Sequence, residues 1–333
     1  MSWAVALRAA RAGSGHDNSA MTSALPNGVT ALSHLGVIRA EGADAASFLH
    51  GQLTQDFALL KPDEARLAAL CTAKGRMIAS FIGVRPRPDL VLLVCSRDIL
   101  TATLKRLSMY VLRAKVKLTD ATASTALFGL AGSALGANDI DAASLPGLRI
   151  ARPATGSEDD ISIVPLYPAD GVPRALWIAP AGEPHPIGDT IDIALWQWGE
   201  VRSGVATLTT PVLDAFVPQM LNYESIGGVN FKKGCYPGQE VVARSQFRGT
   251  LKRRAYVTTA SAQVEAGQEV FAAADADQPV GTVVQAAPAP DGRWAALVSM
   301  QITALDAGPL HAGGSGGPVL QVAPLPYPLL DDI

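Results

Sequence analysis

The sequence predicts an α+β fold in which a mixed region over residues 29–250, with room for two subdomains, precedes a small C-terminal β-barrel over residues 251–329. Apolar strand-like runs and helical stripes are mixed in the first region, whereas short strands separated by glycine and proline follow Lys252. Short strands at this spacing are typical of a small closed barrel. A chain of 333 residues is also long enough to bury two or three separate cores. The expected barrel strands cover residues 255–259, 269–273, 281–285, 294–300 and 319–322.

The bulk composition indicates a folded chain without a membrane-spanning segment. Hydrophobic residues make up 48% and charged residues 17% of the sequence, unlike the composition of disordered chains. No run approaches the roughly 20 apolar residues that are needed to cross a bilayer. The net charge of −3 supplies no long-range attraction to nucleic acid, so direct nucleic-acid binding is not expected.

The cysteines bear on the cellular location and on metal binding. Cys71, Cys95 and Cys235 lie far apart and form no Cys-x-x-Cys pair, which argues against a disulfide framework and against a self-contained zinc or iron–sulfur site. We therefore expect a cytoplasmic protein with no intrinsic metal. Residues 1–28 are rich in alanine, glycine and serine, and we expect a disordered or artefactual extension there.

Residues 42–118 predict alternating strands and helices. Two apolar runs flank Gly75, which can supply the positive φ of a tight turn between strands. Apolar residues then recur at helical spacing after Asp98, which we expect to cap that helix. The other expected elements are a helix between Gly42 and Gly51, strands over residues 67–71, 77–84 and 90–95, and a strand that begins at residue 116.

Residues 121–188 mix short apolar runs with glycine, proline, aspartate and serine, and we expect them to complete the same α+β unit. An amphipathic helix then ends near Gly204, with an apolar stripe that consists of Ile191, Leu195 and Trp198. Trp196 falls off this stripe and shares the polar face of Glu200. On that face, Trp196 either covers a domain interface or stacks against a flat ligand.

A basic segment surrounds Cys235. Residues 231–254 contain seven lysines and arginines and one acid, a local charge of +6. Gly234–Gly238 is a turn sequence, and Gln239–Phe247 predicts a helix whose N-terminus would follow the thiol. Neighbouring lysines and a helix N-terminus both favour thiolate over thiol, which would make the cysteine reactive. The alternative is a small buried hydrophobe, which we expect for the two other cysteines because they lie in apolar runs.

Several segments together closely resemble the signature of the YgfZ family of folate-binding proteins. They are Gly51–Asp56, Cys71–Gly75, Phe216–Gln219, Leu325–Tyr327 and, above all, Phe231–Arg244 with Lys-Gly-Cys-Tyr-Pro-Gly-Gln-Glu at its centre. The resemblance implies an aminomethyltransferase-like fold, in which an α+β folate-binding region precedes a β-barrel and the ligand lies in a central channel. It also implies a tetrahydrofolate-type cofactor and an accessory role in the assembly or repair of iron–sulfur clusters on client enzymes, including tRNA-thiolating enzymes.

The same resemblance assigns roles to individual residues. The catalytic residues that we expect are Cys235, as the functional thiol, Lys233, Gln239 and Glu240. The ligand-binding residues that we expect are Trp196, which matches a folate-contacting tryptophan, Asn222 and Arg244. Two positions depart from the family pattern. Leu35 stands where some relatives have a second ligand-contacting tryptophan, and Arg202 stands where many have a pterin-recognising glutamate.

Two other functions stay open at this point. A folate-dependent aminomethyl transferase would share the fold but has an acid instead of cysteine in the corresponding loop, so Cys235 favours an accessory protein without an independent turnover reaction. An RNA-binding module rests only on the basic segment, which lacks the interleaved aromatic residues that stack on bases.

Overall fold

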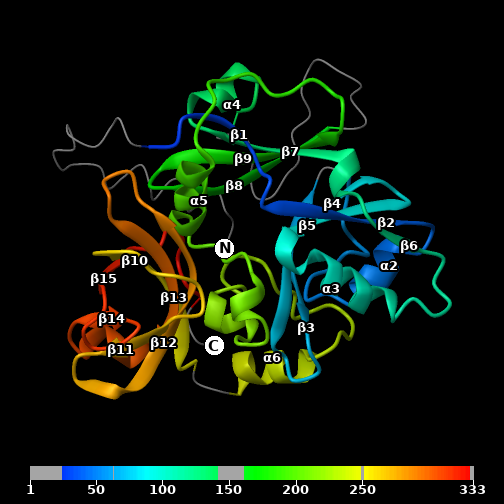
Figure 1. The fold of residues 1–333 in the computed structure, drawn as a ribbon. Helices are drawn as coiled ribbons and strands as arrows, with labels where there is room; N and C mark the ends of the chain where they lie inside the picture. Colours follow the sequence, from blue (N-terminus) through cyan, green and yellow to red (C-terminus); the bar gives the residue numbers. More distant parts are fainter. Residues whose placement is uncertain (1–24, 63, 142–160, 249–250, 331–333) are drawn as a thin grey trace.

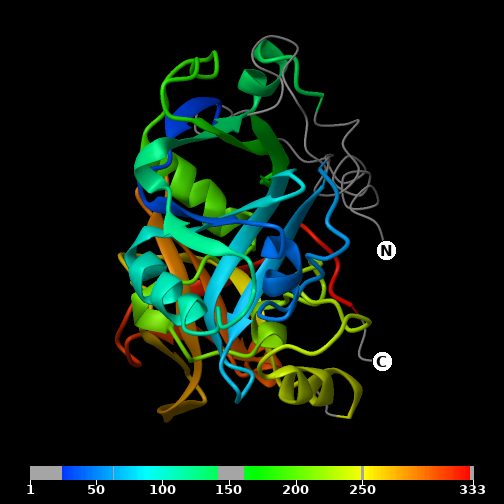
Figure 2. The same ribbon diagram turned by 90° about the vertical axis from the view of Figure 1, so that its right-hand side faces the viewer.

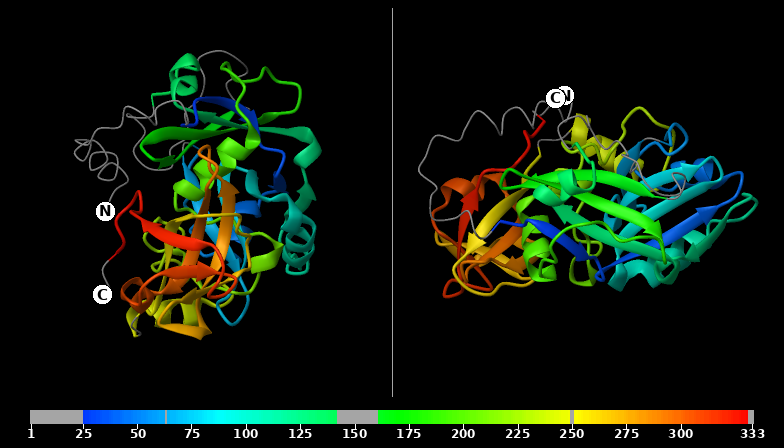
Figure 3. Two further views of the ribbon diagram at one scale, coloured as in Figure 1. Left: turned by 60° about the vertical axis from the view of Figure 1, so that its left-hand side comes forward. Right: turned by 90° about the horizontal axis from the view of Figure 1, so that it is seen from above.

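The computed structural model describes residues 25–62, 64–141, 161–248 and 251–330. The fold consists of two antiparallel sheets and a closed barrel, and α5 (Ile193–Arg202) lies between the four-stranded sheet and the barrel (Figure 1). The view from above shows the four-stranded sheet lying across the molecule, with the barrel at one end and the five-stranded sheet at the other (Figure 3). The α+β fold with a C-terminal barrel is therefore confirmed.

The five-stranded sheet follows the expected hairpin and continues it. Its strand order is β3 (Ala65–Cys71), β4 (Met77–Arg87), β5 (Leu90–Ser96), β2 (Leu35–Glu41) and β6 (Lys117–Asp120). Leu67 pairs with Ile82 near the middle of the hairpin, and Gly75 takes a φ of +72° at its tip. The accompanying helices are α2 (Ala45–His50) and α3 (Arg97–Ser108).

The expected cap of α3 is wrong. Ser96, not Asp98, occupies the N-cap position, because the helix begins at once where β5 ends. The carboxylate of Asp98 instead accepts hydrogen bonds from the hydroxyl of Ser96 at 2.7 Å and from the backbone N–H of Thr210 at 2.8 Å. Asp98 therefore ties α3 to a distant loop.

The strands of residues 121–141 and 161–188 form a second sheet together with a strand from the start of the described chain. Its order is β1 (Gly28–Ala31), β7 (Thr125–Ala131), β9 (Val172–Pro180) and β8 (Ser162–Ala169). Leu176 and Trp177 alternate across β9, so that Leu176 faces the five-stranded sheet and Trp177 packs in the core beside α4 (Ser133–Ala137). This alternation gives the sheet two buried faces.

The barrel closes in the order β10 (Arg253–Ala260), β13 (Trp294–Gln301), β12 (Asp275–Pro288), β11 (Glu269–Ala272), β14 (Leu310–Ala312) and β15 (Val319–Ala323). All five expected strands are present, and the short β14 was not expected. The remaining elements are α6 (Gln239–Phe247) and the 3-10 helices η1 (Thr122–Ser124), η2 (Thr210–Val212), η3 (Pro218–Leu221) and η4 (Ile302–Asp306). The proposed boundary after residue 250 adjoins residues 249–250, which lie outside the described residues, as does most of the expected extension before β1.

The amphipathic interpretation of α5 is wrong at Trp196. This side chain is fully buried, although it was expected on a polar face off the core. The helix contacts β8 and β1 of the four-stranded sheet as well as β12 and β13 of the barrel. A helix that is covered on several sides has no single solvent face, so its apolar stripe does not report which residues are buried.

Candidate functional site

A central cavity lies between the two sheets, beside α5. It consists of two adjoining hollows with empty volumes of about 470 and 430 Å³. Leu67 and Ile82 of the hairpin, Leu166 of β8, Glu200 of α5, and Val205 and Thr207 line both hollows. The walls are mostly apolar, and a few polar groups converge on them, which is the usual composition of a small-molecule site.

Two side chains hold a carboxylate at this cavity. Glu200 accepts a hydrogen bond from the indole N–H of Trp196 at 3.0 Å. His34 Nε2 lies 3.1 Å from both oxygens of Glu200 and must carry its proton there, because a carboxylate only accepts. That tautomer leaves Nδ1 of His34 buried without a hydrogen-bond partner. Trp196 and His34 therefore fix the position of the Glu200 carboxylate.

Arg174 brings a cation to the same cavity. The residue is 2% exposed, lines the second hollow, and places its guanidinium carbon 4.2 Å from the centroid of the Trp196 ring. Nη1 donates to the backbone oxygen of Gly199 at 3.0 Å, whereas Nε and Nη2 are buried without a partner. Burial lowers the pKa of Arg174 to about 10, and the nearby charge of Glu200 opposes that shift.

Gly129 on β7 makes room for Trp196. A Cβ atom at this position would lie 2.6 Å from three carbons of the indole ring. The indole of Trp196 is thus contacted by the guanidinium of Arg174 and by the backbone of Gly129. The indole is a wall of the cavity rather than an open platform.

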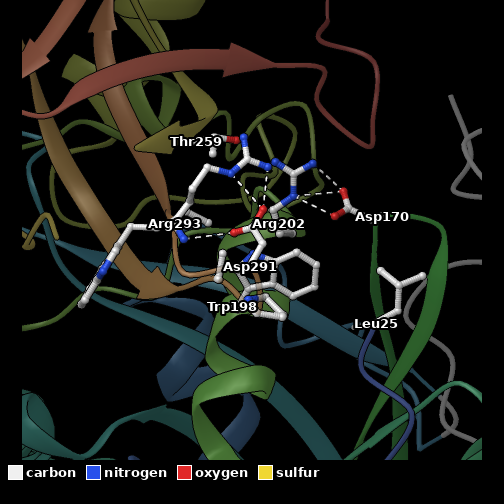
Figure 4. Close-up of a pocket in the computed structure, with 11 residues that line it drawn as sticks. Leu25, Asp170, Trp198, Arg202, Thr259, Asp291 and Arg293 are labelled. Carbon is white, nitrogen blue, oxygen red and sulfur yellow. Dashed lines mark hydrogen bonds and ion pairs between the residues drawn. The ribbon is translucent and has the colours of Figure 1, made fainter. Parts of the chain in front are cut away.

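A third hollow of about 520 Å³ lies between α5 and the barrel (Figure 4). Its two arginines are already paired. Asp170 accepts from Nε and Nη2 of Arg202, and Asp291 accepts from Nε and Nη2 of Arg293, with Nη2 distances of 2.6 Å in both cases. Figure 4 shows these two pairs beside Trp198. Because the charges are satisfied within the chain, this hollow makes a weaker case for a ligand than the central cavity.

The segment around Cys235, residues 231–238, is called the thiol loop below. Lys233 anchors it: the residue is 8% exposed, and its ammonium donates to the backbone oxygens of His50 and Leu53, the latter at 2.8 Å. The same ammonium lies 4.6 Å from the centroid of the Tyr236 ring. Burial lowers the pKa of Lys233 to about 8, against the charges of Asp56 and Cys235.

The thiol itself is exposed, whereas Cys71 and Cys95 are buried as expected. Gly238 ends the loop with a φ of +81° and comes so close to the β3–β4 turn that a Cβ would lie 2.4 Å from the backbone oxygen of Thr72. The predicted helix follows as α6, with the expected bounds. Figures 1 and 2 place α6 at the end of the molecule opposite the four-stranded sheet.

The structure divides the expected site residues between separate places. Cys235, Lys233, Gln239, Glu240 and Arg244 share the thiol loop and α6. Within that group, Arg244 and Glu240 form an exposed ion pair at 2.6 Å, which contributes little to stability. Trp196 borders the central cavity, and among the described lining residues none comes from the thiol loop or α6.

Asn222 lies in a third place. It is fully buried with a left-handed φ of +59°, and its amide pairs with both backbone groups of Ala255 and with the hydroxyl of Tyr327. Asn222 therefore joins η3 to the first barrel strand. Its contacts favour a structural role over ligand contact.

The sequence reasoning missed Arg174, His34 and the role of Glu200 in the cavity. Glu200 was within reach, because it follows Trp196 by four residues and therefore lies beside it on a helix. Arg174 offered a weaker indication, a single charge inside an apolar strand. His34 carried none, because its partner lies 166 residues away.

Two negative findings concern the described ranges only. Within residues 25–62, 64–141, 161–248 and 251–330, no cluster of three or more His, Cys, Asp or Glu side chains could hold a metal ion. In the same part of the chain, no helix is long and apolar enough to span a membrane.

Known proteins share this architecture. Residues 14–137 match the family described as the GCVT N-terminal domain. The crystal structure of the glycine cleavage system aminomethyltransferase T from Bartonella henselae superposes with a TM-score of 0.64 at 16% identity, over 92% of this chain and 87% of that protein. The protein therefore has an aminomethyltransferase-like fold.

Sequence similarity narrows the class further. The tRNA-modifying protein YgfZ of Sodalis glossinidius (strain morsitans) is 30% identical over 92% of this chain and 94% of its own length. The protein of that name from Edwardsiella ictaluri (strain 93-146) is 32% identical over 68% of this chain and 69% of its own length. The chain belongs to the YgfZ family, as the signature around Cys235 indicated.

Proposed function

We propose that this protein binds a tetrahydrofolate-type ligand in the central cavity and uses Cys235 to support iron–sulfur client enzymes, including those that modify tRNA. The observation that carries the proposal is the cavity itself. It lies between the sheets of an aminomethyltransferase-like fold and contains a buried guanidinium whose Nε and Nη2 have no partner. Family membership then makes a folate the first ligand to test.

The cavity residues fit such a ligand in chemistry. The apolar walls suit a pteridine ring, while Glu200 and Arg174 offer an acceptor and a donor. When bound, tetrahydrofolate would supply a carrier for one-carbon units. The protein's own groups orient the ring and exclude water from it.

Ligand binding is testable by tryptophan fluorescence. Titration with tetrahydrofolate should quench the emission of the wild type, because Trp196 borders the cavity. Trp196→Phe should lose most of the response. Trp177→Phe is the matched control, since Trp177 packs on the opposite face of β9 and should leave the quenching unchanged. Equal quenching in the wild type and Trp196→Phe would refute the assignment of Trp196 to the ligand site.

The thiol is tested in cells. Cys235→Ser is nearly isosteric at an exposed position, so the variant should fold normally and bind tetrahydrofolate with unchanged affinity. In a strain that lacks its own YgfZ-family protein, it should fail to restore iron–sulfur enzyme activity and thiolated tRNA, because a serine hydroxyl does not ionise at cellular pH. Full complementation by the serine variant would refute a functional thiol and leave folate binding untouched.

The fold favours one second candidate, folate-dependent aminomethyl transfer. This reaction would move a one-carbon unit from an aminomethyl donor onto tetrahydrofolate with release of ammonia, and it needs no thiol of this protein. Purified wild type and Cys235→Ser would then form the one-carbon folate at the same rate. The accessory role predicts no such turnover by the protein alone.

A further inference from the structure

Arg174 differs from other arginines of the chain at one edge of its guanidinium. In Arg39, Arg202 and Arg293 the two parallel N–H groups of Nε and Nη2 point to a carboxylate of a nearby residue, and the pairs lie at least partly in solvent. In Arg174 the same edge is unpartnered although the residue is only 2% exposed. A buried donor without an acceptor is unfavourable, and a charged group pays a larger desolvation cost than a neutral one.

The position of Arg174 suggests what satisfies this edge. Nη1 and the ring face of the guanidinium are occupied by the Gly199 carbonyl and by Trp196, so the group is held rigidly. The side chain lines the hollow that Glu200 also lines. Glu200 keeps acceptor capacity, because Trp196 and His34 use only part of the four lone-pair sites of a carboxylate.

We propose that Arg174 and Glu200 form a donor–acceptor pair that binds the N–H and C=O edge of a 2-amino-4-oxo ring, with the 4-oxo oxygen on the open edge of Arg174. This inference rests on the proposed function and names the ring edge that the cavity selects. A carbonyl oxygen has two lone pairs and can accept from both N–H groups, while the adjacent ring N–H donates to Glu200. The pair reads the ring by complementary hydrogen bonds, as arginine reads guanine in DNA.

Arg202 shows the contrast within the chain. Its Nε and Nη2 are held by Asp170 in the hollow beside the barrel. The described linings of the central cavity do not include it. Among the described lining residues of the central cavity, Glu200 and Arg174 are the charged ones, so they are the groups available to bind the ring edge.

The test compares two ligands that differ at one position. Tetrahydrofolate carries a 4-oxo acceptor, and its 4-amino counterpart presents N–H donors that would face Arg174. Wild type should bind the 4-oxo ligand at least about tenfold more tightly in calorimetric titration, since a site built for one hydrogen-bonding pattern rejects the opposite one. Arg174→Met should lose much of this preference, and the part that remains would come from Glu200, which accepts from the ring N–H that the 4-amino ligand lacks.

Two further variants separate a specific role from a structural one. Arg174→Lys keeps the charge but cannot present two parallel N–H groups, so it should reduce the preference while it retains the fold, and it serves if the methionine variant unfolds. Arg202→Met is the matched control, because its partner is Asp170, and it should keep the wild-type preference. Thermal unfolding of each variant reports whether the fold is intact.

Each contrary outcome has a distinct meaning. Equal binding of the two ligands by wild type would overturn the ring-edge assignment and leave folate binding in place. Binding of neither ligand would instead overturn the proposed function. If the Arg174 dependence disappears with tetrahydropteroate, which lacks the glutamate, then Arg174 binds the ligand's carboxylate and the assignment fails.

Discussion

The central cavity and the thiol loop each bury a cation, and they treat it in opposite ways. The ammonium of Lys233 donates hydrogen bonds to two backbone oxygens and lies over an aromatic ring, so it is satisfied by groups of the same chain. Arg174 is buried as deeply but keeps two N–H groups without an acceptor. The first arrangement is a scaffold that holds a loop in place. The second is a preformed binding group. Lys233 therefore positions the thiol loop, whereas Arg174 is available to bind a ligand.

The two regions also differ in exposure, and thiol labelling tests that difference with the largest expected effect. Cys235 is exposed, whereas Cys71 and Cys95 are 1% and 2% exposed and burial raises the pKa of each to about 12. Iodoacetamide at pH 8 should modify Cys235 roughly 1,000-fold faster than the other two, which react only through opening of the fold. Peptide mass spectrometry resolves the three rates.

The informative exception would be Cys95, which lines the central cavity. Rapid labelling of Cys95 in the native protein would mean that the cavity exchanges freely with solvent, and the contrast with the thiol loop would fail. Tetrahydrofolate should not alter the rate at Cys235, because the described cavity linings exclude the thiol loop.

The scaffold role of the thiol loop is tested by two glycines with the same backbone strain. Gly238 and Gly227 have φ values of +81° and +77°, so alanine is strained at both. Only Gly238 also lacks space, since its Cβ would lie 2.4 Å from the backbone oxygen of Thr72, whereas nothing lies within 4 Å at Gly227. We expect Gly238→Ala to lower the free energy of unfolding by about 3 kcal/mol and Gly227→Ala by about 1 kcal/mol.

Function should separate the same pair. Gly238→Ala should lose complementation, because the turn holds the thiol, but should bind tetrahydrofolate normally in the folded fraction. Equal stability losses in the two variants would show that the packing of the loop against Thr72 contributes nothing.

The cavity wall offers a similar comparison with a smaller effect. Gly129→Ala places a Cβ 2.6 Å from the indole of Trp196 and should cost about 2 kcal/mol of stability, since overpacking a filled core typically costs 1–3 kcal/mol. The displaced ring should also weaken tetrahydrofolate binding, measured by calorimetry. Gly136→Ala in α4 meets no atom within 4 Å and should be neutral or slightly stabilising. An unchanged ligand affinity in Gly129→Ala would separate Trp196 from the binding site.

Local patterns account for what the sequence predicted well. The turn at Gly75 and helix α6 after Gly238 depend on residues within a few positions of one another, and both match the structure. The barrel strands were recognisable because glycine and proline mark their ends. The burial of Cys71 and Cys95 followed from apolar strands in the same way.

Long-range packing accounts for what it did not predict. Trp196 was placed on the polar face of the helix, off the apolar stripe, because nothing local shows that α5 is enclosed by the four-stranded sheet and the barrel. Arg174 went unnoticed because its significance lies in partners that are missing, which only the folded structure reveals. Asn222 was grouped with the ligand residues through its motif, whereas its buried contacts join it to Ala255 and Tyr327.

The smallest expected effect concerns the charge of Lys233 itself. Burial lowers the pKa of Lys233 from 10.5 to about 8, so the folded state releases this proton more readily than the unfolded chain does. Between pH 8 and 10.5 the unfolded state then binds more protons, and the contribution of Lys233 to stability rises with pH. The slope cannot exceed about 1.4 kcal/mol per pH unit, and we expect about 1 kcal/mol between pH 8 and 9. Urea unfolding of wild type and Lys233→Met at pH 7, 8 and 9 should show this rise only in wild type, while titrating groups common to both, such as Cys71 and Cys95, cancel in the difference. Parallel curves would mean that the oxygens of His50 and Leu53 hold the proton on Lys233 throughout this range, and the buried ammonium of the thiol loop would then be as permanent a charge as the guanidinium of Arg174.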